Sequence, residues 1–84
     1  MASAREWVRQ MVAKCEAEPL PTEAVLKLLE RQVGQGEKMM LNVQAILDVL
    51  DRELIERNDG PVMRQLWLTV MEYYEMVLEA RAAA

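Results

Sequence analysis

The sequence predicts an all-α protein, a small antiparallel bundle of three to four helices with a long helical hairpin at its C-terminal end. Apolar residues recur every three or four positions along most of the 84-residue chain, which is the period of a helix face. The three Gly and three Pro lie between these periodic segments. With 52% apolar and 29% charged residues, residues 1–84 have the composition of a single compact domain and not of a disordered chain.

The first expected helix covers residues 3–17. Ser3 can accept a hydrogen bond from a backbone N–H of the first turn while Glu6 reaches back toward it, as in a capping box. The helix ends before Pro19, because the proline ring disfavours a helical residue ahead of it. Its apolar side consists of Trp7, Val8, Met11, Val12 and Cys15.

The second expected helix covers residues 22–33, with Thr22 as its cap and Glu23 complementing the positive end of the helix dipole. Gly34 and Gly36 follow it, and they favour a break before the next helix over a kink. Its apolar side consists of Val25, Leu26, Leu28, Leu29 and Val33.

The third and fourth expected helices, residues 37–57 and 61–82, form the hairpin. The Asn-Asp-Gly sequence of residues 58–60 tolerates turn geometry, and Pro61 suits the first position of a helix. Helices joined by so short a loop fold back antiparallel. The main apolar stripe of the third helix is Met39, Val43, Ile46, Leu50 and Leu54, flanked by Met40, Leu47 and Val49.

The fourth helix carries two apolar seams, which are offset by one residue and therefore lie about 100° apart. The first seam is Val62, Leu66, Val70, Tyr73 and Val77, and the second is Met63, Trp67, Met71, Tyr74 and Leu78. A single neighbouring helix can cover one seam. Either the first two helices cover the other and the whole stripe is core, or part of it is a surface that binds another protein. On the second interpretation the partner-binding residues are Trp67, Met71, Tyr74 and Leu78, with Met39 and Met40 lining the same surface.

The residue types predict a protein that is not an enzyme. The chain has no His, and so it lacks the commonest general base and metal ligand. Glu72, Glu75 and Glu79 share one helix face, and we interpret them as a solvated strip, since the liganding loop of an EF-hand is absent. We expect no catalytic residue, no metal and no cofactor, and we expect Cys15 to be a small buried apolar residue.

The charge distribution narrows the class of partner. The net charge is −4, and the acidic excess lies in residues 37–84. An acidic surface repels phosphate groups, so we expect binding to neither nucleic acid nor membrane. The first residues have no apolar run of signal-peptide length, and no run reaches the length that spans a bilayer. The expected location is therefore the cytoplasm.

Three segments of the predicted hairpin, AILDVL, RNDGP and EYYEMVLEA, carry a resemblance to a known family. Through them residues 42–82 resemble the paired C-terminal helices of flagellin-specific export chaperones. More broadly, a small acidic helical chain with an amphipathic last helix resembles the chaperones of type III secretion systems. The resemblance implies that the protein binds an aggregation-prone partner and keeps it soluble, with no cofactor and no reaction.

Three functions stay open on the sequence. The first is a secretion-type chaperone or adaptor that docks an amphipathic helix of another protein against the third and fourth helices. The second is a small phage- or plasmid-type inhibitor that covers the surface of a target with its acidic half. The third is a structural homodimer, in which paired fourth helices bury the extra seam and place Trp67 near the two-fold axis.

Overall fold

A computed structural model describes residues 3–57 and 60–83 of the chain. Within these ranges the regular structure is helical and contains no strand, so the predicted all-α class is confirmed. The four helices are α1 (Ala4–Ala17), α2 (Thr22–Val33), α3 (Met39–Arg57) and α4 (Pro61–Ala83). None of the helices in these ranges is both long enough and apolar enough to cross a membrane.

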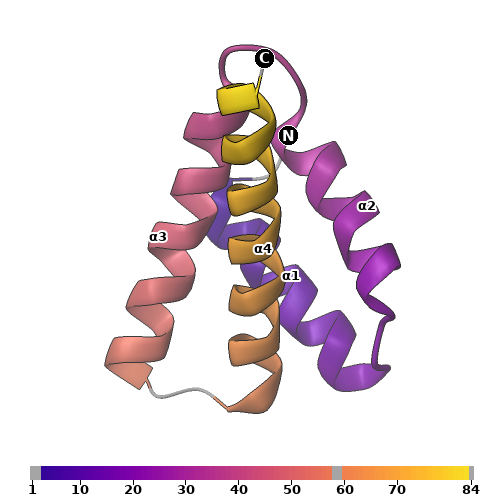
Figure 1. Cartoon of the computed structure of the whole chain (residues 1–84). Helices are drawn as coiled ribbons and strands as arrows, with labels where there is room; N and C mark the ends of the chain where they lie inside the picture. The colour runs from indigo at the N-terminus through magenta and orange to yellow at the C-terminus, as the bar shows by residue number, and fades with distance from the viewer. Residues whose placement is uncertain (1–2, 58–59, 84) are drawn as a thin grey trace.

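The hairpin of α3 and α4 forms the main body of the bundle (Figure 1). These two helices run antiparallel and share the most extensive contact between any two helices. Helices α1 and α2 each pack against both members of the hairpin but scarcely touch one another. The longest dimension of the molecule, 38 Å, is close to the length of about 35 Å expected for a helix of the size of α4.

Helix α1 begins as the sequence predicts. The Oγ atom of Ser3 accepts a hydrogen bond from the N–H of Glu6 at 3.2 Å. At the other end, the N–H of Glu18 donates to the carbonyl of Lys14 at 2.9 Å, and the chain then leaves the helix in an extended conformation.

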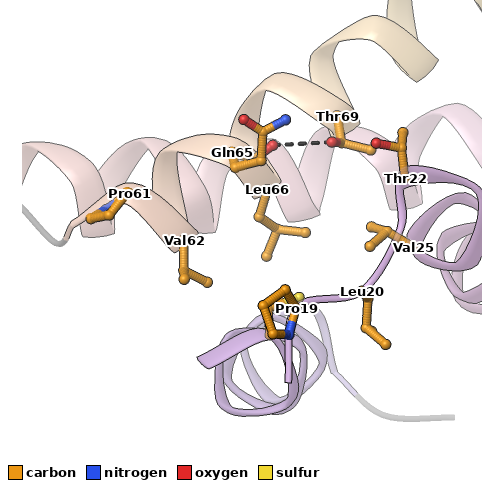
Figure 2. A pocket seen from close by; sticks show the side chains of 10 residues that line it. Pro19, Leu20, Thr22, Val25, Pro61, Val62, Gln65, Leu66 and Thr69 are labelled. Atoms are coloured by element: carbon orange, nitrogen blue, oxygen red, sulfur yellow. Dashed lines mark hydrogen bonds between the residues drawn. The ribbon is translucent and has the colours of Figure 1, made fainter. Parts of the chain in front are cut away.

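The expectation that Thr22 caps α2 is wrong. Thr22 is the first residue of the helix, and Pro21 occupies the cap position with an extended backbone. The carbonyl of Pro21 accepts hydrogen bonds from the N–H groups of Ala24 and Val25, at 3.0 and 3.2 Å. The φ of Pro21 is −65°, which a helix also accepts, but its ψ of 151° keeps the chain extended, so the helix starts one residue later. Figure 2 shows this α1–α2 connection beside the first turns of α4.

The chain breaks between α2 and α3, as the two glycines predict. Gly34 and Gly36 have φ values of 70° and 85°, in the left-handed region that favours glycine. The side-chain amide of Asn42 donates to the carbonyl of Val33 at 2.9 Å and so ties the start of α3 to the end of α2. Helix α3 begins at Met39, after the expected residue 37.

At the other end of the hairpin, Pro61 is the first residue of α4, in agreement with the prediction. The carbonyl of Gly60 accepts a hydrogen bond from the N–H of Arg64 at 3.3 Å. The turn expected at Asn58 and Asp59 lies outside the described residues.

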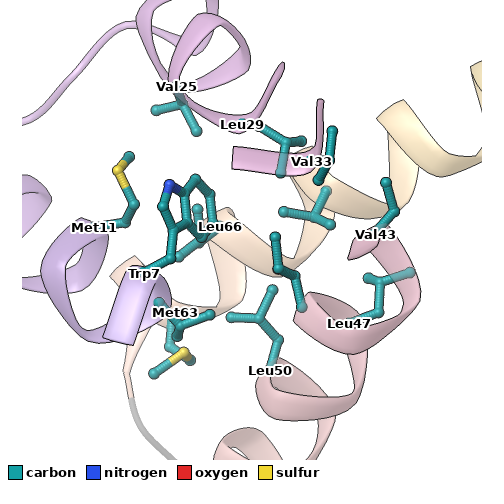
Figure 3. Packing of buried hydrophobic residues seen from close by; sticks show 13 residues of the cluster. Trp7, Met11, Val25, Leu29, Val33, Val43, Leu47, Leu50, Met63 and Leu66 are labelled. Atoms are coloured by element: carbon teal, nitrogen blue, oxygen red, sulfur yellow. The ribbon is translucent and has the colours of Figure 1, made fainter. Parts of the chain in front are cut away.

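All four helices contribute to one apolar core (Figure 3). Leu29 of α2, Leu50 of α3 and Val70 of α4 are completely enclosed, and Val8 and Met11 of α1 close the same cluster. The buried apolar residues are Trp7, Val8, Met11, Val25, Leu29, Val33, Met40, Val43, Ile46, Leu47, Leu50, Met63, Leu66 and Val70. The core therefore takes part of every predicted stripe and, on α3, also the flanking residues Met40 and Leu47, while Met39 and Leu54 of the main stripe are only half-buried.

Candidate functional site

The buried face of α4 follows the first predicted seam and includes one residue of the second. Leu66 and Val70 of the first seam and Met63 of the second are buried. Further along the first seam, Tyr73 and Val77 are half-buried. The core therefore takes part of each seam, and neither seam is wholly enclosed by the rest of the chain.

Helix α3 runs along the second seam at Trp67 and Tyr74, whereas Met63, at the start of the seam, lies beside residues of α1. The indole Nε1 of Trp67 donates a hydrogen bond to the carboxylate of Asp51 at 2.7 Å. About two turns further along α4, the hydroxyl of Tyr74 accepts a hydrogen bond from the side-chain amide of Gln44 at 3.4 Å. Both bonds are exposed, and they hold the polar ends of the two rings on the α3 side of α4. Because a bond to a carboxylate is stronger than one between neutral groups, the Trp67 contact is the firmer of the two.

The four α4 residues predicted to bind a partner lie together along this α3–α4 boundary. Trp67, Met71 and Tyr74 are half-buried and pack against the edge of the core. Leu78, nearest to the C-terminal end, is 43% exposed. Part of each side chain is therefore accessible at the surface.

The two methionines predicted to line the same surface are placed differently. Met40 is buried, with 9% of its surface exposed, so it offers little to a partner. Met39 is half-buried, and its sulfur accepts a hydrogen bond from the hydroxyl of Tyr73, a residue of the first seam, at 3.7 Å. The sequence pattern placed Met39 on the main stripe and Met40 beside it, but it did not reveal that α2 and α4 both contact this end of α3.

Sequence reasoning missed three exposed apolar residues on the outer faces of α3 and α4. On α3, Ile55 is 82% exposed and Leu41 is 65% exposed, while Leu68 of α4 is partly exposed next to Trp67. Leu41 and Ile55 are two heptads apart and so lie on one face of α3, with Asp48 midway between them. Apolar residues at this spacing on an otherwise polar face were the signal that could have identified them.

Acidic groups lie among these apolar side chains. Asp48 shares the outer face of α3 with Leu41 and Ile55, and Asp51 is the partner of Trp67. On α4, Glu75 is one heptad beyond Leu68 and so lies on the same side as that residue. A shallow hollow of about 400 Å³ on the outer face of α3 is lined by Asp48, Asp51, Arg52, Ile55 and Glu56.

We call this region of α3 and α4 the hairpin surface. Its apolar members are Leu41, Ile55, Trp67, Leu68, Met71, Tyr74 and Leu78, and its carboxylates are Asp48, Asp51 and Glu75. Since the bonds of Trp67 and Tyr74 set the register of the hairpin, Leu41 lies at the level of Leu78 on α4, and Ile55 lies near the loop end. The hairpin surface therefore extends along much of the hairpin.

Among the residues that the structure describes, Tyr73 is the one whose pKa the fold shifts, and it is not part of the hairpin surface. Burial raises the pKa of Tyr73 above its usual value of 10.0, and the negative charge of Glu30 adds to the increase. Its bond to the Met39 sulfur keeps the hydroxyl in this environment. The phenolate is therefore less favourable in the folded chain than in the unfolded one.

The described ranges contain no group of three or more Cys, Asp or Glu side chains placed to hold a metal ion. In the same ranges, every buried side-chain nitrogen and oxygen has a hydrogen-bond partner. Cys15 is half-buried, and so it is more accessible than the sequence predicts.

No known protein family matches the chain, and comparisons with curated proteins and with solved structures give no match either. The resemblance of residues 42–82 to flagellin-specific export chaperones therefore stays a prediction.

Proposed function

We propose that the protein is a non-catalytic binding module, a small chaperone or adaptor that docks an amphipathic helix of another protein on the hairpin surface. The observation that carries the proposal is the row of accessible apolar side chains along the α3–α4 hairpin, which lies outside the fully buried part of the core. Ile55 and Leu41 are the most exposed large aliphatic residues of this surface.

The exposed area is large enough to contribute to binding. Full burial of a Leu or Ile side chain is worth about 1.5–3 kcal/mol, so covering the exposed parts of Leu41 and Ile55 would supply about 2–4 kcal/mol. Trp67, Met71 and Tyr74 would add the parts of their surfaces that α3 leaves accessible. Association also has an entropic cost, so these residues would act together and not singly.

The shape of the hairpin surface favours a helical partner. Leu41 and Ile55 are 14 residues apart on one helix, which corresponds to about 21 Å along its axis. A partner helix of about four turns has this length, and its apolar residues at i, i+3 or i+4, and i+7 would contact both α3 and α4.

The carboxylates favour a basic partner over a second copy of this chain. Asp48, Asp51 and Glu75 are exposed among the apolar residues, so Lys or Arg beside the apolar stripe of a partner would meet opposite charges. A two-fold dimer through the same surface would instead bring two sets of carboxylates together, which is unfavourable. We therefore assign the surface to a helix with an apolar stripe flanked by basic residues.

The proposal is tested by comparing two variants in partner capture. The Leu41→Gln/Ile55→Gln double variant removes the two most exposed residues of the hairpin surface. Met76→Gln is the matched control, because Met76 is 61% exposed and is two residues from Leu78, on about the opposite side of α4. We expect a specific protein to be captured from the native host by the wild type and by the control, and to be lost with the double variant.

Direct binding of the captured protein then decides the result. A synthetic peptide of its basic amphipathic helix should bind the wild type in calorimetry, and the double variant should weaken the binding at least tenfold. Equal binding by the double variant would refute the proposal. A wild-type dimer in sedimentation equilibrium that dissociates in the double variant would favour the homodimer instead.

A further inference from the structure

A cleft lies on the other side of the molecule, between the α1–α2 connection and the first turns of α4 (Figure 2). Helices α1 and α2 scarcely touch, and the connection between them contains Pro19 and Pro21. Its backbone is extended at Glu18, which precedes Pro19, and at Pro21. We call the space the proline cleft, which is lined by Cys15, Pro19, Leu20, Thr22, Val25, Pro61, Val62, Gln65, Leu66 and Thr69.

The size and walls of the proline cleft suit a small molecule. Its volume is about 310 Å³, at the lower end of the range of about 300–1,000 Å³ that is typical of small-molecule sites. Val25 and Leu66 belong to the buried core, so the deepest part of the cleft is rigid. Leu20 and Val62 are half-buried and form its sides. A partner helix is too wide for a space of this size.

The lining excludes a charged ligand. None of the ten lining residues is charged, although 29% of the chain is. A charged group that entered the cleft would lose its hydration without gaining a counter-charge, which is unfavourable. An uncharged apolar molecule would lose only weakly bound water there.

Polar atoms along one side of the cleft define one further property of the ligand. Thr69 is buried, and its hydroxyl donates to the carbonyl of Gln65 at 3.0 Å. Because that bond uses its proton, the oxygen of Thr69 can only accept a further hydrogen bond. Figure 2 shows Thr69, Gln65 and Thr22 along one side of the cleft, with Pro19 and Leu20 opposite them.

We propose that the proline cleft binds a small, uncharged, mainly apolar molecule that carries one hydrogen-bond donor, such as an indole or a phenol. The apolar part contacts Val25, Val62 and Leu66, and the donor is directed to the oxygen of Thr69. This site is separate from the hairpin surface, because Val62 and Thr69 lie on the side of α4 that faces away from Asp51 and α3. It does not depend on the proposed function.

The experiment is an NMR titration of the ¹⁵N-labelled full chain with indole. We expect saturable shifts at the amides of Leu20, Thr22, Val62 and Thr69, and none at the amides around Leu41. Indole-3-acetate, which carries a negative charge, should bind at least tenfold more weakly. N-methylindole lacks the donor and should bind about three- to tenfold more weakly than indole, as expected for the loss of one hydrogen bond.

Four variants test the assignment of the site. Val62→Trp places a large side chain in the cleft and should abolish the saturable shifts. If that variant is unstable, Leu20→Trp tests the same effect, because Leu20 lies in the connection between α1 and α2. Leu68→Gln, on the outer side of α4, should leave indole binding unchanged. Thr69→Val should weaken indole about three- to tenfold but leave N-methylindole unaffected.

Clear outcomes would overturn the proposal. Shifts that increase linearly with indole and spread over the whole apolar surface would show only weak, non-specific contact. Equal affinity for indole and indole-3-acetate, or unchanged binding by folded variants with a filled cleft, would also refute it. Circular dichroism of each variant confirms that the fold is intact before its binding is compared.

Discussion

Two isoleucines of the same helix provide a direct test of which apolar residues the fold needs. Ile46 and Ile55 both lie on α3, but Ile46 is 1% exposed and Ile55 is 82% exposed. Replacing either with Ala removes the same atoms and makes the same small change in helix propensity. Any difference between the two variants therefore reports the packing of the side chains.

The expected magnitudes follow from the burial. Ile46→Ala leaves a cavity in the core and should lower the free energy of unfolding by about 2–5 kcal/mol. Ile55→Ala removes atoms that are already in water and should change it by less than about 0.5 kcal/mol. A domain of this size has a total stability of about 4–13 kcal/mol, so the first variant loses a large part of it.

The assay is urea denaturation followed by far-UV circular dichroism, at two protein concentrations tenfold apart. A loss above about 1.5 kcal/mol in Ile55→Ala at both concentrations would mean that Ile55 is buried within a single chain, and the hairpin surface would lose its most exposed member. A loss that grows with protein concentration would instead place Ile55 in an interface between copies of the chain.

Three further measurements test other parts of the structure. Asp51→Ala removes the acceptor of the hydrogen bond from the Trp67 indole. The NMR signal of the Trp67 Nε1–H should therefore shift, this proton should exchange faster with water, and the free energy of unfolding should fall by about 0.5–1.5 kcal/mol. An unchanged signal would contradict the hydrogen bond. The pKa of Tyr73 is raised in the folded chain, so the unfolded chain loses this proton first as the pH rises. The stability that the protonated Tyr73 contributes should therefore be complete below pH 10 and decrease as the pH rises through the folded pKa. Tyr73→Phe should reduce this decrease in urea denaturation at high pH. Gly34→Ala should lower the free energy of unfolding by about 1–2 kcal/mol, because the φ of Gly34 is 70°. Gly60 does not have a φ in the left-handed region, so Gly60→Ala should be near neutral. Equal effects of the two variants in thermal or urea unfolding would contradict this backbone geometry.

The helices themselves were predictable because their signals are local. Ser3 and Pro61 act within one turn of the chain, and the glycines between α2 and α3 act through their own backbone angles. Thr22 was assigned wrongly for a related reason: the side chain of Thr can cap a helix, but the conformation of the preceding Pro21 decided where the helix began.

The candidate site was predictable only in part. A helical wheel places Trp67, Met71, Tyr74 and Leu78 on one seam, and they do lie together. It does not tell which neighbour covers the seam, and so the contacts with α3 and the burial of Met40 were not foreseen. The proline cleft has no sequence signature, because its walls come from two segments, residues 15–25 and 61–69, that are distant in the chain.

Periodicity and the positions of Gly and Pro are sufficient, in this chain, for the helical class, for a bundle of three to four helices and for most of the helix ends. These properties depend on interactions between residues a few positions apart. The order in which the helices pack, the choice of buried flank on α4 and the surfaces that stay open depend on contacts between distant residues. Because each amphipathic stripe is wider than the contact that a single neighbour makes, several packings satisfy the same pattern, and only the balance of all side-chain contacts selects one.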